Sequence, residues 1–322
     1  MPGSRLHTVD GYKTPSELGI PRSGPRDLPT PSTSPVYVLV TAVKNEERTL
    51  QTTIDSVLAQ TVRPHEWVIV DDGSSDRTPH ILSEVTKKNP WIRIVSRETS
   101  PIRDFANVAR ALNFAVNQLT VRHYEFLGVL DGDIRLPANY YEAILNKFDS
   151  DPTLGLAGGA VIDVGTLNMD GVSSEEIAGA VQLFRRLALS SCLPFAEIPE
   201  GGWDAVTNCL VRHAGFKTRT FRDIRIDHLK PRNSAQGGHF RRRWQYGERD
   251  YALGTGLGFQ FSKCLFRMAE YPWVIGSIIR LTSYGFCRIR RRPRALSPAL
   301  CRIMEDERRA RLTHLIFKGR RW

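Results

Sequence analysis

The sequence predicts an α/β protein with a mainly parallel, doubly wound sheet and helices on both faces. Short apolar runs alternate with segments of helical periodicity between residues 36 and 130, at the spacing of βαβ units. The 322 residues are 41% apolar and 25% charged, which suits one large folded domain with additions. Two of the apolar runs end in acidic residues, which is typical of a ligand site at the edge of such a sheet.

The elements follow one another in a regular order after a Pro-rich stretch, residues 1–34, that we expect to be a flexible leader. Strands are expected at 36–40, 67–70, 92–95 and 124–130, and helices at 46–60, from Ser75 or Asp76 to Lys88, and at 105–119. Beyond Asp151 the alternation loosens into a strand at 156–164, further helices, and an extended segment at 218–227.

The C-terminal region, residues 236–322, is expected to form basic amphipathic helices. The net charge of the chain is +11, and residues 285–322 carry 12 Lys or Arg against 3 Asp or Glu. Residues 256–290 are rich in apolar and aromatic side chains, and two interpretations stay open for them: packing in a core or lying at a membrane interface. Charge alone also allows nucleic acid, but no recognisable binding motif supports that partner, and none is expected.

Signals for location are few. The N-terminus has no apolar segment typical of a signal peptide, and no run of about 20 uncharged apolar residues predicts a transmembrane helix. The five cysteines form no C-x-x-C pair and no disulfide framework, which favours a reducing compartment. We therefore expect a cytoplasmic protein, and two interpretations stay open for its basic C-terminal region: peripheral contact with the anionic inner face of a membrane, or a solvated tail.

Acidic residues follow two of the expected strands. Asp71 and Asp72 follow the second strand, and Asp131-Gly132-Asp133 follows the fourth. Because the carboxyl ends of parallel strands meet at one edge of a sheet, like charges gathered there favour a bound cation. Turn chemistry is the alternative, since Asp readily occupies turns. With a glycine that permits a tight turn, the second cluster suits Mg²⁺ or Mn²⁺ held by carboxylates and substrate phosphate oxygens.

Two common phosphate-binding loops do not follow the first expected strand. Neither G-x-x-x-x-G-K-[ST] nor G-x-G-x-x-G occurs there, and the strand runs instead into Thr41-Ala42-Val43-Lys44-Asn45-Glu46-Glu47. This disfavours a P-loop NTPase and a dinucleotide-dependent dehydrogenase. A ligand that carries a diphosphate and shares a metal ion with the carboxylates fits the residues better.

Four motifs in register resemble those of family 2 glycosyltransferases of the GT-A fold. They are Thr-Ala-Val-Lys-Asn-Glu-Glu at 41–47, Val-Asp-Asp-Gly-Ser-Ser-Asp at 70–76, Ala-Leu-Asn at 111–113 and Leu-Asp-Gly-Asp at 130–133. The similarity covers roughly residues 35–230. It implies a GT-A catalytic domain over 35–235, with a donor half at 35–134 and an acceptor half at 135–235.

The resemblance implies which residues line the nucleotide. Ala42 and its neighbours, among them Thr41 and Glu46, would surround the base. Asp72, preceded by Asp71 at the strand end, would accept a hydrogen bond from the base, commonly uracil. The donor would accordingly be a nucleotide-diphosphate sugar, with a UDP-sugar favoured.

The resemblance also implies a metal site. Asp131 would lie near the ribose or the metal, and Asp133 would hold the divalent ion, Mn²⁺ or Mg²⁺, that bridges the diphosphate. His228 is a candidate third ligand, because several GT-A enzymes supply a late histidine; a core or surface histidine is the alternative. Relatives often carry Gly-Lys where this chain has Asn107-Val108, so Arg110 is the candidate for a phosphate contact, unless it only forms the charged face of a helix.

Asp204 is the candidate catalytic base. Many relatives carry Glu-Asp at the start of an acceptor-side helix, with a glycine eleven residues after the Asp; here Trp203-Asp204 and Gly215 stand at that spacing. A helix cap is the alternative role, for which Asp is favoured. If Asp204 is the base, the reaction is a single displacement with inversion, in polysaccharide or glycoconjugate synthesis, on a glycan or lipid-linked acceptor. A non-catalytic nucleotide-sugar binding scaffold and a sugar nucleotidyltransferase are the alternatives.

Overall fold

The computed structural model describes residues 35–97, 104–165, 173–230 and 238–318, with side chains described up to Arg311. The leader expected over residues 1–34 lies outside the described residues. The strands are β1 (Tyr37–Val43), β2 (Glu66–Asp71), β3 (Ile92–Ser96), β4 (Phe126–Leu130), β5 (Ile134–Arg135), β6 (Leu154–Asp163), β7 (Val181–Arg185) and β8 (Lys217–His228). The helices are α1 (Leu50–Leu58), α2 (Thr78–Lys88), α3 (Ala106–Gln118), α4 (Tyr140–Ser150), α5 (Arg186–Leu189), α6 (Trp203–His213), α7 (His239–Ala252), α8 (Leu257–Phe266), α9 (Trp273–Ile289) and α10 (Pro298–Lys318).

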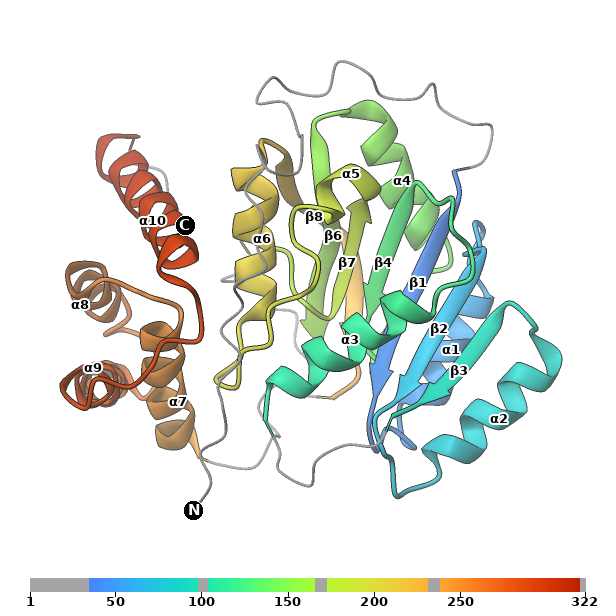
Figure 1. Ribbon diagram of the computed structural model, residues 1–322, viewed down its shortest axis with the longest axis horizontal. Coiled ribbons are helices and arrows are strands. Elements are labelled where there is room, and N and C mark those ends of the chain that lie inside the picture. Colours follow the sequence, from blue (N-terminus) through green and yellow to red (C-terminus); the bar gives the residue numbers. More distant parts are fainter. Residues whose placement is uncertain (1–34, 98–103, 166–172, 231–237, 319–322) are drawn as a thin grey trace.

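The eight strands form one sheet in the order β3-β2-β1-β4-β7-β6-β8-β5 (Figure 1). In its first half, β1 pairs in parallel with both β2 and β4, and β2 pairs in parallel with β3. In the second half β7 is antiparallel to β4 and β6, and β5 is antiparallel to β8, while β6 and β8 are parallel. The expectation of a mainly parallel sheet therefore describes the first half, and the second half is mixed.

Helices cover both faces of the sheet. Along β1, Tyr37 and Leu39 point into the core that α1, α2 and α4 complete. Val38 and Val40 point to the opposite face, where α3, α5 and α6 pack. This alternation is the period of a strand buried on both faces, and it explains the continuous apolar run of the sequence.

Several element boundaries differ from those expected. The helix expected from 46 begins at Leu50, because the backbone before it bends to bring Glu46 against α2, where the Glu46 N–H donates to Thr78 Oγ1 at 2.8 Å. The N-cap of α2 is Arg77 rather than Ser75 or Asp76, although an Asp76 oxygen accepts the Thr78 N–H at 2.9 Å. Strand β7, which the sequence did not indicate, separates β4 from β6.

The C-terminal helices α7 to α10 lie beside the sheet, on the side of α6 (Figure 1). Leu300, Cys301 and Met304 of α10 join the core that α6 shares with the sheet. Among the residues that the structure describes, no helix has both the length and the apolar character needed to cross a membrane. All five cysteines are buried and unpaired with one another.

Candidate active site

The two acidic motifs lie at the same edge of the sheet. Strands β2 and β4 flank β1, and the Asp72 N–H donates to the Val43 carbonyl, where β1 ends, at 2.9 Å. Gly132 approaches the same residue from the other side, because a Cβ built on it would lie 2.7 Å from Val43 Cγ1. Gly132 is therefore required by this close approach. It lies in a turn, as expected, but its φ lies outside the left-handed region, so the turn by itself does not require glycine.

Asp71 and Asp72 have different environments. Asp71 Oδ1 accepts the Ser74 N–H at 3.0 Å, so this carboxylate closes a turn. Asp72 is buried, and the Arg97 guanidinium donates to its Oδ1, through Nε at 2.9 Å and also through Nη2. Arg97 was not identified from the sequence. It follows β3, which pairs in parallel with β2, and this pairing carries the cation to the β2 end.

Asp131 and Asp133 form a concentrated negative region. Burial and the neighbouring Asp133 charge raise the pKa of Asp131 to about 7. The charges of Glu46 and Asp204 add to the increase, and the charge of His228 opposes it. Carboxylates in such a setting stay ionised only when a cation or hydrogen-bond donors compensate them. Within the described parts of the chain, no three His, Cys, Asp or Glu side chains are already assembled as a metal cage. A hard cation that takes its remaining ligands from a phosphorylated substrate suits this partial donor set.

His228, at the end of β8, lies between two carboxylates. Its Nδ1 is 2.9 Å from Asp163 Oδ1, and its Nε2 is 3.4 Å from Asp133 Oδ2. Burial lowers the pKa of His228, but the bonds and charges of Asp133 and Asp163 outweigh burial and raise it. A carboxylate on one ring nitrogen is the arrangement that orients a metal-binding histidine, and it directs Nε2 towards Asp133. The residues therefore fit a divalent ion, with Asp163 as a partner that the sequence did not indicate.

The remaining residues assigned to the nucleotide lie near this edge, each with local contacts. Thr41 is buried, and its hydroxyl accepts the Trp67 Nε1–H at 2.9 Å, while Ala42 beside it is only partly buried. A Glu46 oxygen accepts hydrogen bonds from Thr49 Oγ1, at 2.7 Å, and from the Lys230 ammonium.

Arg110 belongs to a separate ion-pair network on α3. Its guanidinium contacts Asp104 at 3.1 Å and Glu197 at 3.2 Å. It also donates to Asn107 Oδ1 at 2.6 Å. The phosphate contact expected of Arg110 stays a prediction, and a phosphate would have to compete with two carboxylates for the side chain.

Asp204 is the second residue of α6 and lies in its first turn. The N-cap is Gly202, whose φ of 101° follows a φ of 83° at Gly201, so Asp204 does not occupy the cap position that the alternative interpretation gave it. Its Oδ1 accepts only the adjacent Ala205 N–H, at 2.9 Å, among the contacts described for it. Trp203, which stands where relatives carry Glu, is nearly buried and packs edge-on against Phe195.

A short segment before β7 joins Asp204 to the acidic edge. A Cβ built on Gly179 would lie 3.3 Å from the Asp204 Cβ, and the next carbonyl, that of Ala180, accepts the Asp131 N–H at 2.9 Å. Asp204 and Asp131 thus both lie against this segment, and the charge of Asp204 adds to the raised pKa of Asp131. The structure brings the expected base and the expected metal site together.

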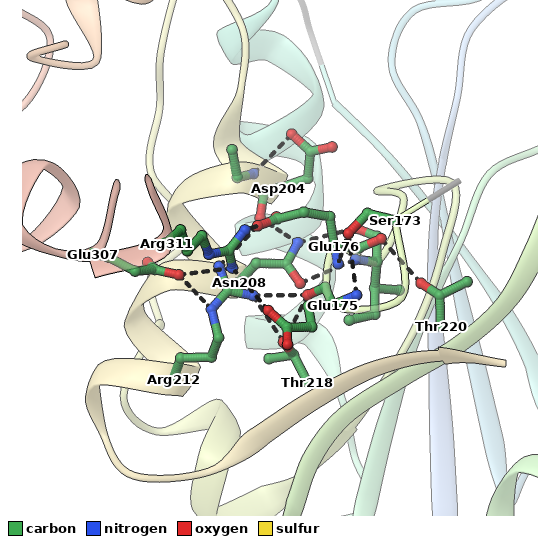
Figure 2. A network of polar contacts seen from close by, with 12 residues as sticks. Ser173, Glu175, Glu176, Asp204, Asn208, Arg212, Thr218, Thr220, Glu307 and Arg311 are labelled. Carbon is green, nitrogen blue, oxygen red and sulfur yellow. Dashed lines mark hydrogen bonds and ion pairs between the residues drawn. The ribbon is translucent and has the colours of Figure 1, made fainter. Parts of the chain in front are cut away.

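A polar network holds the segment and α6 in place (Figure 2). Asn208 of α6 bonds Ile177 twice, accepting its N–H at 3.1 Å and donating to its carbonyl at 3.0 Å, and donates to the Asp204 carbonyl at 2.9 Å. Further along α6, Arg212 contacts Glu176 at 3.0 Å. Glu307 of α10 accepts from Arg212 Nε at 2.6 Å, so the C-terminal helix supports the same assembly.

The sequence comparisons identify a family for part of the chain. Residues 38–185 match the family model described as Glycosyl transferase family 2. Poly-beta-1,6-N-acetyl-D-glucosamine synthase from Staphylococcus aureus (strain COL) is 26% identical over 168 residues, 52% of this chain and 36% of that protein. The Staphylococcus epidermidis synthase is 26% identical over 183 residues, 57% of this chain and 40% of that protein. The matched part thus spans well under half the length of these curated relatives.

Two solved structures share the fold. The mannosyltransferase PcManGT from Pyrobaculum calidifontis, in complex with GDP-Man and Mn2+, gives a TM-score of 0.55 at 19% identity and covers 84% of this chain and 78% of that one. S. aureus TarS 1-349 in complex with UDP-GlcNAc gives a TM-score of 0.50 at 14% identity. This similarity covers 78% of this chain and 71% of that one. The expected GT-A fold is confirmed. Residues 38–185, a little under half of the chain, thus form a domain of the glycosyl transferase family 2 type on a GT-A fold.

Proposed function

We propose that the chain is a metal-dependent, inverting glycosyltransferase that moves a sugar from a nucleotide-diphosphate donor, with a UDP-sugar favoured, to an acceptor hydroxyl. One observation carries the proposal: Asp131, Asp133 and His228 meet at the edge of the sheet, and the Gly179–Ala180 segment lies against both Asp131 and Asp204. An ion site for a diphosphate and a carboxylate on the acceptor side are the two parts that such a transfer needs.

Asp133 and His228, with Asp131 beside them, would hold the divalent ion. When bound, the ion supplies Lewis-acid neutralisation of the charge that develops on the departing diphosphate. The complex of PcManGT with GDP-Man and Mn2+ supports a divalent ion for this chain. Asp163 would keep the His228 ring oriented through its Nδ1 contact of 2.9 Å.

Asp204 would act on the acceptor. Its carboxylate takes the proton of the acceptor hydroxyl while that oxygen forms the new bond to the anomeric carbon and the bond to the diphosphate breaks. Because attack and departure occur on opposite faces in one step, the anomeric configuration inverts. The bonds of Asn208 to the Asp204 carbonyl and to Ile177 would fix the position of this carboxylate relative to the donor.

Asp72 and Arg97 would contact the base of the nucleotide. Asp72 would accept a hydrogen bond from the base, and the Arg97 guanidinium would hold that carboxylate in place. The UDP-GlcNAc complex of TarS and the similarity to the staphylococcal synthases support a UDP-sugar and a role in polysaccharide or glycoconjugate synthesis. The acceptor would be a glycan or a lipid-linked sugar, and the enzyme would act in the cytoplasm.

A donor panel tests the proposal. Purified protein with Mn²⁺ is incubated with UDP-, GDP- and dTDP-sugars without an acceptor. The released nucleoside diphosphate is measured for the unaltered chain and for the Asp133→Ala variant. We expect slow hydrolysis of one donor class that depends on Mn²⁺ and disappears in the variant. Donor binding without release of diphosphate would instead support the binding scaffold. Pyrophosphate formation from a nucleoside triphosphate and a sugar phosphate would support a nucleotidyltransferase.

A further inference from the structure

The outer helix α9 has its polar side turned inward. Its buried residues are Gly276, Ser277, Arg280, Ser283, Tyr284 and Cys287. Its exposed side carries a stripe of large apolar residues, with Ile275 57%, Ile278 55%, Phe286 37% and Ile289 83% exposed. A helix on the surface of a water-soluble domain shows the opposite arrangement, with its apolar stripe towards the core.

The inward side of α9 is held by polar contacts with α7. Arg280 is 3% exposed and pairs with the buried Asp250 at 2.6 Å. Ser283 donates to the Trp244 carbonyl at 2.7 Å. Gly247 allows the two backbones to approach, because a Cβ built on it would lie 2.3 Å from the Arg280 carbonyl oxygen. Small residues and polar contacts between helices are typical of packing in an apolar medium.

Helix α8 repeats the arrangement. Gln260 and Cys264 are its buried residues, and the Lys263 ammonium turns inward to Asp250 at 2.9 Å. Outward it presents Leu257 51%, Phe261 58%, Leu265 56% and Phe266 76% exposed. The connection to α9 adds Tyr271 58% and Trp273 64% exposed, and aromatic residues of this kind collect at membrane interfaces. Both helices lie on the outer side of the molecule, away from the sheet (Figure 1).

The charge of this region is complementary to an anionic surface. Residues 257–294 contain eight Lys or Arg and one acidic residue, Glu270. Directly after the apolar stripe, five arginines are exposed: Arg288, Arg290, Arg291, Arg292 and Arg294. An apolar stripe that ends in a basic cluster is the composition of helices that lie in the plane of anionic membranes.

We propose that the exposed apolar side of α8 and α9, with the arginines of 288–294, is a docking face for an anionic lipid membrane. The 17 residues of α9 span about 25 Å, so the helix lies along the bilayer surface with its stripe among the acyl chains and headgroups. This inference does not depend on the proposed transfer reaction, since lipid binding requires neither donor nor acceptor.

Vesicle flotation of the full chain tests the docking face, with vesicles of phosphatidylcholine alone and of phosphatidylcholine with phosphatidylglycerol. We expect binding to the anionic vesicles that weakens as NaCl rises from about 0.1 to 0.5 M. Ile275→Asn with Ile278→Asn in α9 should weaken it by about tenfold or more. Phe261→Ser with Phe266→Ser in α8 is an independent second variant. Leu187→Asn, at an apolar residue of α5 that is 50% exposed, is the matched control and should bind as the unaltered chain does.

A fluorescence measurement reports on the face directly. Brominated anionic lipid should quench the tryptophan emission, and Trp273→Phe should remove most of that quenching. Failure of the unaltered chain to float with anionic vesicles, or equal flotation of both double variants, would overturn the proposal. A dimer interface at this face would also overturn the proposal. In that case light scattering would show the unaltered chain as a dimer and both double variants as monomers, and none of the three proteins would bind vesicles.

Discussion

The sheet and the outer helices of this chain are organised in opposite ways. Strands β2 and β4 are buried along their whole length, and the polar side chains that matter gather where the strands end. In α9 the buried side holds Ser277, Arg280 and Ser283. Ile275, Ile278 and Ile289 face outward. The first arrangement is what water imposes on a folded chain, and the second suits a surface that meets an apolar environment. Burial alone therefore separates the catalytic part from the region we assign to the membrane.

The largest effect is expected in the first region, at Asp204. Asp204→Asn keeps the size of the side chain and removes its basicity, so kcat should fall by about 10²–10⁴-fold while donor affinity stays unchanged. Steady-state kinetics together with calorimetry of donor binding in Mn²⁺ measure the two quantities. Glu197→Gln, which alters an exposed carboxylate on the connection before α6, is the control. Near-normal kcat in Asp204→Asn would remove this residue from the mechanism.

In the second region the largest effect is expected at the buried charges. Asp250→Ala leaves Arg280, which is 3% exposed, without its carboxylate, and should lower the free energy of unfolding by about 3–5 kcal/mol. Asp223→Ala breaks an exposed pair with Lys147 and should cost less than about 1 kcal/mol. Urea unfolding measures both variants. If both variants lowered the free energy of unfolding equally, the inward polar side of α9 would not be essential to the packing of α7 and α9.

The loss of unfolding free energy in Asp250→Ala should depend on pH, and its direction follows from the sign of the pKa shift of Asp250. The cations Lys263 and Arg280 outweigh the effect of burial and lower the pKa of Asp250 below its ordinary value of 3.8. A lowered pKa in the folded state gives a stabilisation that is complete above that ordinary value and decreases as the pH falls below it. The cost of Asp250→Ala should accordingly be full at pH 7 and smaller at pH 3.

Two isoleucines in helices sharpen the comparison. Ile54 of α1 is 0% exposed, and Ile54→Ala should lower the free energy of unfolding by about 2–5 kcal/mol because it leaves a cavity. Ile278 of α9 is 55% exposed, and Ile278→Ala should change it by no more than about 0.5 kcal/mol. Urea unfolding without lipid measures both. A large cost at Ile278 would mean that its side chain is covered in solution.

The parts of the molecule that the sequence revealed are those governed by local patterns. The strands β1, β2 and β4 appear as apolar runs because they are buried on both faces, and the acidic motifs follow from the strand ends. Strand β7 was missed because it inserts between β4 and β6 through pairings with residues distant in the chain. Composition also marked residues 256–290 as a region of amphipathic helices, but composition cannot say which side of a helix faces the protein.

Two residues of the site were not identified from the sequence, and the reason is the same for both. Asp163 stands opposite His228 only because β6 and β8 pair in parallel with that register. Arg97 reaches Asp72 only because β3 lies beside β2. Neither residue belongs to a motif, so only the pairing of strands brings it to the site.

Asp163 offers the smallest and most specific test of the sheet edge. Asp163→Ala removes the carboxylate 2.9 Å from His228 Nδ1 and frees the ring to rotate, so the affinity for Mn²⁺ should fall by about 10–100-fold. Electron paramagnetic resonance of free Mn²⁺, with donor nucleotide present, measures the affinity without requiring turnover. Asp163→Asn keeps a hydrogen-bond acceptor for Nδ1 and should recover part of the loss. If Asp163→Ala binds Mn²⁺ as the unaltered chain does, His228 belongs to the structure of the edge and not to the ion.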